Sequence, residues 1–302
     1  MEVRKVNGFF IIFVIGYIGL SVVCASIMAY AQNSGIAVPD WIQYVMSEGI
    51  ILLIAIIYMI VQKIDPIREI PYKRIGIVDV ILSLVAGYCL IPAVLLISNL
   101  SMLFSTNYLE EGTTTLLTYP FAMQVILLAV IPPLVEELIF RGIFFGSYRK
   151  AGMTGAALMS GLLFGCFHLN INQALYAFVM GIVFAYMVEA TGSLWSSVIA
   201  HFAVNTYSIG IVQILKMAGI YAQDGSVSET FENAESVAGQ STAVTVVQIA
   251  MIAVIAAVFM MLAVLCIRTM AKRHGNLEKM KIQKVKLSHI KNYFTAPVIV
   301  GI

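Results

Sequence analysis

The chain has 302 residues, of which 60% are hydrophobic and 11% are charged, and its mean hydropathy is +0.93. A soluble globular domain carries about 25% charged residues, so a water-soluble fold of this length would lack the charges to cover its surface. The same composition excludes a disordered chain, and the formal net charge of +2 excludes a nucleic-acid binder. The apolar stretches are continuous and do not alternate with polar residues, which excludes an outer-membrane barrel. We therefore predict an all-α polytopic membrane protein.

Eight apolar segments approach the length of about 20 residues that a helical span needs. The fifth is short, which is typical of a re-entrant or buried segment. The first resembles a signal peptide, but its apolar run exceeds the ~7–15 residues of a signal h-region, so we predict an uncleaved span. In chain order the predicted spans are 8–31, 45–62, 76–100, 117–140, 153–167, 172–190, 194–215 and 243–267.

Lys and Arg residues concentrate in alternate loops. The other loops, at 32–44, 101–116 and 216–242, contain acidic residues and a single basic one, Lys216. The positive-inside rule then places both termini of this multi-pass protein in the cytoplasm of the cell. The basic groups are Arg4 and Lys5, Lys63 to Arg74, Arg149 and Lys150, and Arg268 to Lys291.

We predict one membrane domain over 1–302, made of N-terminal spans (1–116), a core (117–210), an extracytoplasmic loop (216–242) and a basic tail (268–302). The tail either anchors the topology or lies on anionic membrane lipid. No internal repeat is visible, which argues against a transporter built from repeated halves. The four cysteines sit alone in different spans and form no metal or disulfide pattern. The oligomeric state is not readable.

Ionisable and amide side chains cluster in three of the spans, where their burial is costly and indicates function. The fourth span carries Glu136, Glu137 and Arg141, of which the last two are four residues apart and share a helix face. The fifth ends at His168, and the seventh carries His201 and Asn205. By helical rise these positions spread over about 12 Å in height, so tilted helices would bring them to one polar cavity. Pro132 and Pro133 should loosen the helix ahead of the glutamates and expose backbone groups.

Such a set of side chains suits hydrolysis. A glutamate in a low-dielectric site acts as a general base toward water, and imidazoles orient that water or protonate a leaving amine. An Asn amide donates to the oxyanion of a tetrahedral intermediate. A glutamate–arginine pair holds the first glutamate in place. Neither GxSxG nor HExxH occurs in the chain.

Three motifs, EExxxR, FxxxH and HxxxN, occur in order as Glu136 to Arg141, Phe164 to His168 and His201 to Asn205. This pattern resembles the CAAX protease and bacteriocin-processing (CPBP) family of intramembrane endopeptidases, which includes the type 2 CAAX prenyl protease. The resemblance covers about 117–210. It implies that Glu136 activates water, that His168 and His201 position it, and that Asn205 stabilises the oxyanion. It also implies that Glu137 and Arg141 brace the site and that Phe164 packs beside it.

These residues suit either a zinc-dependent or a metal-free site. Glu136, His168 and His201 form a plausible zinc set, since a catalytic zinc needs three protein ligands and a water. We favour a metal-free site because a metal would leave Asn205 without a clear role. The expected substrate is a membrane-associated, prenylated or leader peptide cleaved on its cytosolic side. A transporter and a non-catalytic peptide-immunity protein are the alternatives.

Overall fold

Residues 3–105, 118–220, 242–282 and 293–302 are described by the computed structural model, and within these ranges the chain forms helices and no strands. Seven of the helices in these ranges are long and apolar enough to cross a membrane. The prediction of an all-α polytopic membrane protein is therefore confirmed. The segments 106–117, 221–241 and 283–292, with most of the predicted extracytoplasmic loop, lie outside the described residues.

Each of the eight predicted spans coincides with a helical segment. The fourth is a single composite helix in which two π-helical stretches interrupt the α-helix, and the fifth has only 15 residues, as its short apolar run predicts. The long helices are α1 (Val3–Asn33), α2 (Trp41–Val61), α4 (Ile77–Ser101), the composite Phe121–Ala151, α9 (Met153–Phe167), α10 (Ile171–Thr191), α11 (Leu194–Met217) and α13 (Thr242–Arg273). The composite comprises α6 (Phe121–Gln124), η2 (Val125–Val130), α7 (Ile131–Glu137), η3 (Leu138–Phe145), α8 (Gly146–Tyr148) and η4 (Arg149–Ala151), and the short elements elsewhere are α3 (Pro66–Glu69), η5 (Leu277–Met280) and α15 (Ala296–Gly301).

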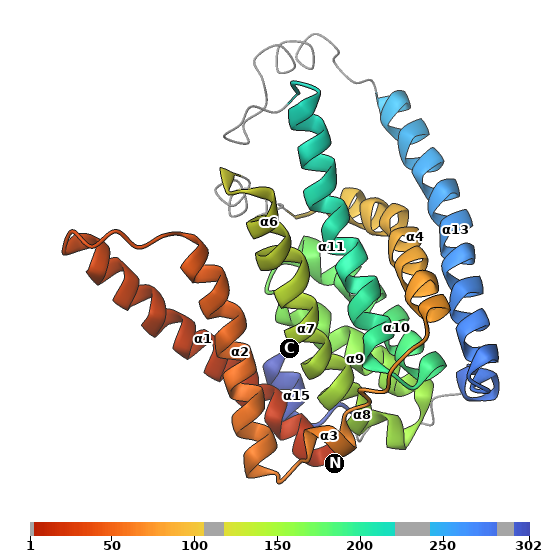
Figure 1. Ribbon diagram of the computed structural model, residues 1–302, viewed down its shortest axis with the longest axis horizontal. Helices are drawn as coiled ribbons and strands as arrows, with labels where there is room; N and C mark the ends of the chain where they lie inside the picture. The colour runs from red at the N-terminus through yellow and green to blue at the C-terminus, as the bar shows by residue number, and fades with distance from the viewer. Residues whose placement is uncertain (1–2, 106–117, 221–241, 283–292) are drawn as a thin grey trace.

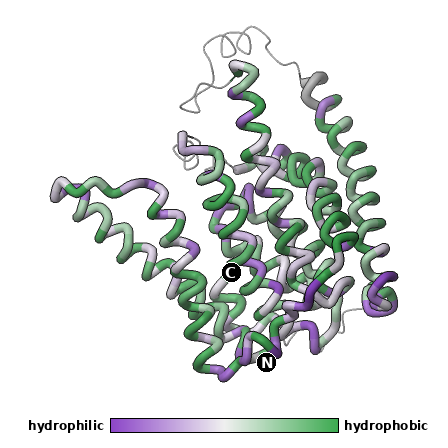
Figure 2. The backbone as a smooth tube through the Cα atoms, in the orientation of Figure 1, coloured by the Kyte–Doolittle hydropathy of each residue, from purple (hydrophilic) through white to green (hydrophobic). Residues whose placement is uncertain are grey.

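The helices form a bundle with one outlying pair (Figure 1). In the bundle, α4 packs against α10, α11 and α13, while α9 and α10 form an antiparallel hairpin beside the composite helix. The pair α1 and α2 leans away from the bundle at the end where its connecting loop lies. Large apolar side chains are exposed along α1 and α13, which is the surface that lipid would cover. Hydrophobic residues follow these helices for most of their length (Figure 2).

The loops that carry the basic residues meet at one end of the molecule. The Tyr148 hydroxyl donates to Asn7 near the start of α1 (2.6 Å), and the Leu194 amide donates to the Pro71 carbonyl ahead of α4 (2.7 Å). At the same end, Asp79 accepts from Arg273 (3.2 Å). These contacts place the N-terminal segment, the loop after α2, the end of the composite helix and the end of α13 on one side of the bundle.

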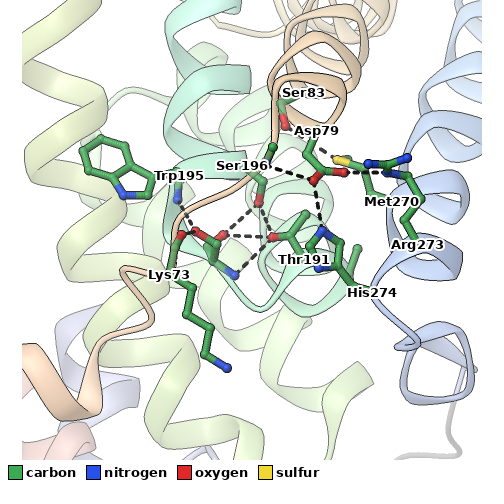
Figure 3. A network of polar contacts seen from close by, with 12 residues as sticks. Lys73, Asp79, Ser83, Thr191, Trp195, Ser196, Met270, Arg273 and His274 are labelled. Atoms are coloured by element: carbon green, nitrogen blue, oxygen red, sulfur yellow. Dashed lines mark hydrogen bonds and ion pairs between the residues drawn. The ribbon is translucent and has the colours of Figure 1, made fainter.

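A polar network reinforces this end (Figure 3). Asp79 is buried at the start of α4 and contacts both Arg273, the last residue of α13, and His274, which follows it (3.0 Å). Nearby, the Thr191 and Ser196 hydroxyls bond one another (2.9 Å) at the turn between α10 and α11. Four helices that cross the membrane are thus tied together by side chains at their ends.

Candidate active site

The composite helix presents two glutamates at the junction of α7 and η3. Glu137 is fully buried, and the Glu136 side chain keeps 12% of its surface exposed. The π-helical stretches lie on either side of this junction, and Pro132 and Pro133 stand just before it. Prolines lack an amide hydrogen, so they interrupt the i→i−4 hydrogen bonds and leave carbonyl groups free ahead of the glutamates. The helix nevertheless continues through Arg141. This continuity is what the estimate by helical rise assumed when it placed the polar residues at similar levels in the membrane.

Glu137 forms a buried ion pair with Arg141, one turn further along the helix. The Glu137 Oε1 and Arg141 Nη1 atoms are 2.8 Å apart, and both side chains are inaccessible to solvent. The guanidinium lies over the ring of Phe164 from α9 (4.3 Å to the centroid) and within 5.2 Å of the Phe184 ring from α10. Arginine stacks on aromatic faces because its charge is delocalised and weakly hydrated, so the two rings help to hold the ion pair.

His201 on α11 joins both glutamates. Its Nδ1 atom is 3.1 Å from Glu137 Oε1, and its Nε2 atom is 3.7 Å from Glu136 Oε2. A carboxylate only accepts, so the hydrogen-bond network assigns the proton of the neutral imidazole to Nδ1. Nε2 is then an acceptor that faces Glu136 across a distance too long for a direct hydrogen bond. The gap suits a bridging water.

His168 lies at the end of α9, where the chain turns into α10. Its Nδ1 atom is 2.7 Å from the Phe164 carbonyl, and its ring meets the Phe164 ring edge-on (4.8 Å). The carbonyl accepts, so Nδ1 again carries the proton and Nε2 is left as an acceptor. Phe164 also contacts His201 edge-on (5.8 Å), so it separates and orients the two imidazoles.

Asn205 has a hydrogen-bond partner that its motif does not predict. Its Nδ2 atom donates to the Leu128 carbonyl (2.9 Å). In a regular helix that carbonyl would accept from the amide of residue 132, which is a proline here. Asn205 therefore satisfies a carbonyl that Pro132 leaves free. No hydrogen bond joins Asn205 to Glu136, His168 or His201 in the described part of the chain, although its second amide hydrogen stays available.

Several buried polar atoms at the site have no partner. Glu137 Oε2 and the Arg141 Nε and Nη2 atoms are buried without a hydrogen bond to any described residue. An unsatisfied buried donor or acceptor costs about 1–3 kcal/mol, so such atoms are expected to face water or a bound molecule. The cluster thus has unused donors and acceptors next to Glu136 and the two histidines.

Small residues bring the supporting helices together. A Cβ atom at Gly165 would lie 2.5 Å from the Ala174 carbonyl oxygen, and one at Gly161 would lie 2.7 Å from the Phe178 carbonyl oxygen. The GxxxG pattern of α9 therefore packs against the α10 backbone. Gly181 of α10 also faces the composite helix, where a Cβ atom at this position would lie 3.0 Å from Arg141 Nη2. These glycines give α9, α10 and the arginine room to meet.

Two further ionisable residues interact electrostatically with Glu136. Glu48 on α2 and Tyr176 on α10 are both within range of its charge, and Glu48 Oε2 is buried without a partner among the described residues. Glu48 lies near the start of its helix, so in the sequence it looks like a residue at a span end. The sequence shows Glu48 only as an acidic residue ahead of an unbroken apolar stretch. The packing of α2 against α7 is what brings this residue near Glu136.

The zinc set proposed from the sequence consists of Glu136, His168 and His201. The two histidines have the tautomer that a metal ligand needs, with Nε2 free. Within the described ranges, however, no three His, Cys, Asp or Glu side chains lie close enough together to hold a metal ion. The metal-free site stays a prediction, and the zinc-dependent site stays its alternative.

The fold and the cluster define a polytopic helical membrane protein with a buried glutamate–arginine–histidine site. Residues 118–207 match the family described as type II CAAX prenyl endopeptidase Rce1-like. This segment contains all three motifs, and the resemblance to CPBP membrane peptidases is therefore confirmed over it.

A protein of Bacillus subtilis (strain 168), named "Putative membrane peptidase YdiL", is 33% identical over 88 residues. The matched part is 29% of this chain and 36% of that protein. No solved structure matches the chain. The family match covers the composite helix, α9, α10 and the first part of α11.

Proposed function

We propose that the protein is an intramembrane endopeptidase in which Glu136 activates the water that attacks a peptide carbonyl. The observation that carries the proposal is the meeting of Glu136, Glu137 and His201, which come from two helices, next to buried polar atoms without partners. The match of residues 118–207 to a peptidase family supports it.

In the proposed reaction a water lies between Glu136 Oε2 and His201 Nε2. Glu136 takes a proton from the water as its oxygen bonds to the carbonyl carbon, and the carbonyl oxygen becomes an oxyanion. The free amide hydrogen of Asn205 donates to that oxyanion. When the intermediate collapses, Glu136 returns the proton to the leaving amine and the C–N bond breaks. His168 Nε2 helps to hold the water.

Glu137 and Arg141 have a positioning role in this scheme. The negative Glu137 carboxylate fixes the Nδ1–H tautomer of His201, so that Nε2 faces the water. Arg141 compensates the charge of Glu137, and Phe164 and Phe184 enclose the guanidinium. The pair thus sets the orientation of the imidazole without contacting the reacting atoms.

The proposed substrate is a membrane-associated peptide or lipidated protein with its cleavage site on the cytosolic side. The basic loops lie at one end of the bundle, and the positive-inside rule assigns that end to the cytoplasm. A prenylated C-terminal peptide and a leader peptide both have this arrangement.

The test is cleavage of a quenched fluorescent peptide library by the purified protein in liposomes. Glu136→Gln removes the base and keeps the shape, so the cleavage rate should fall about 10²–10⁴-fold. Asp40→Asn, the same carboxylate-to-amide change at an exposed position, should leave the rate unchanged. Full activity of Glu136→Gln would refute the proposal. Loss of activity with a chelator and recovery with zinc would instead support the metal-dependent alternative.

A further inference from the structure

A cavity lies away from the candidate active site, where α10, α13 and η5 meet. Its volume is about 490 Å³, within the range of about 300–1,000 Å³ that ligand pockets occupy. Nine of the twelve residues that line it are apolar, and they come from α10 (Val183), α13 (Ala263) and the segment after α13 (Leu277) among others. The three charged lining residues are Arg268, Glu278 and Lys281.

The charged side of this cavity is strongly basic. Residues 268–282 contain five Lys and Arg residues against one acidic residue, Glu278. Lys281 forms an ion pair with Glu278, but both side chains are more than two-thirds exposed. The pair therefore contributes little to stability, and Lys281 can exchange Glu278 for another anion. The exposed Arg268 has no hydrogen-bond or ion-pair partner among the described residues. The cavity therefore offers two cations to an anionic group.

The lining of the cavity changes from apolar to charged along α13, from the middle of the helix to its C-terminal end. Towards the middle of the helix its lining is apolar, and the neighbouring surface is a band of exposed apolar side chains that includes Val254, Val258 and Leu262. Towards the end, α13 becomes hydrophilic (Figure 2). This end is fixed to the bundle by Arg273 on Asp79 and by Asn276 on the Ala190 carbonyl (3.1 Å). A ligand here would have its apolar part in the bilayer core and its charged part at the surface.

We infer that this cavity binds an anionic phospholipid of the membrane. An acyl chain lies between α10 and α13 against Val183 and Ala263, and the phosphate is bound by Arg268 and by Lys281, which exchanges its contact with Glu278 for the lipid. Basic pockets between membrane helices on the cytoplasmic side bind anionic headgroups in this way. The inference does not depend on the proposed peptidase activity.

The experiment uses the full chain in phosphatidylcholine liposomes that contain a phosphatidylglycerol with a photoreactive acyl chain. After illumination, mass spectrometry of peptides locates the labelled residues. We expect labels on α10 and α13 residues that line the cavity, and a decrease of about tenfold in the Arg268→Gln/Lys281→Gln double variant. The Lys63→Gln/Arg68→Gln variant removes the same charges from exposed positions at the same end of the molecule and should label like the parent.

Three outcomes would overturn the inference. Equal labelling by photoreactive phosphatidylcholine would show contact with bulk lipid only. An unchanged label in the Arg268→Gln/Lys281→Gln variant would remove the role of the two cations. Photo-crosslinks between two copies of the chain at this cavity would show that a second protomer fills it. Gel filtration of each variant shows that it is folded, so a loss of label is attributable to the cavity.

Discussion

At the scale of single residues, the site depends on side chains with more than one partner. Glu137 contacts both Arg141 and His201, and Asn205 donates to the Leu128 carbonyl and is proposed to donate to the oxyanion as well. Because these residues have both structural contacts and proposed roles in catalysis, activity and stability must be measured separately for each substitution.

Asn205→Ala separates the two roles of the amide. It leaves the Leu128 carbonyl without a partner, so the free energy of unfolding should fall by about 1–3 kcal/mol. If Asn205 also donates to the oxyanion, kcat should fall about 10²–10³-fold at equal folded fraction. Peptide cleavage and unfolding by denaturing detergent measure the two effects. A stability loss with unchanged kcat would leave Asn205 as a structural residue only.

The Glu137–Arg141 pair predicts non-additive effects. Glu137→Gln keeps an acceptor for His201 but leaves Arg141 as an uncompensated buried charge, which should cost about 3–5 kcal/mol of stability. Adding Arg141→Met removes that charge, so the double variant should recover most of the loss. The same unfolding assay tests this. If the double variant is as unstable as Glu137→Gln, the ion pair is not the cause.

At the scale of the helices, close packing of α9 on α10 positions Phe164 and His168. Gly165 touches the α10 backbone, which cannot move aside as a flexible side chain would. The two π-helical stretches of the composite helix add a second irregular feature, next to the glutamates. π-helical turns of this kind recur at functional sites.

Gly165→Val should separate α9 from α10 and destabilise the protein by several kcal/mol, because its side chain would overlap the Ala174 carbonyl. Gly19→Val on α1 introduces the same side chain where no atom lies within 4 Å, and it should have little effect. Thermal unfolding in detergent compares the two. Equal stability of the two variants would show that α9 and α10 do not need this contact.

At the scale of the whole molecule, the shared position of the basic loops predicts the topology. In a variant without the native cysteines, Ile67→Cys in α3 should react with a membrane-impermeant thiol reagent only from the cytoplasmic side. Ser34→Cys, in the loop between α1 and α2, should react only from the outside. Both positions are exposed. Labelling of both from the same side would contradict the orientation taken from the positive-inside rule.

Composition and the length of the apolar runs were enough to predict the helical membrane fold and its eight apolar segments, because a helix needs about 20 apolar residues to cross a bilayer. The three motifs were identified by their resemblance to a known family. Helical spacing predicted the Glu137–Arg141 pair, since both residues belong to one helix. Contacts between helices depend on tilt, rotation and side-chain rotamers, which have no local pattern. Only the tertiary structure therefore decided that Phe184 encloses Arg141, that Asn205 bonds the carbonyl freed by Pro132, and that Glu48 approaches Glu136.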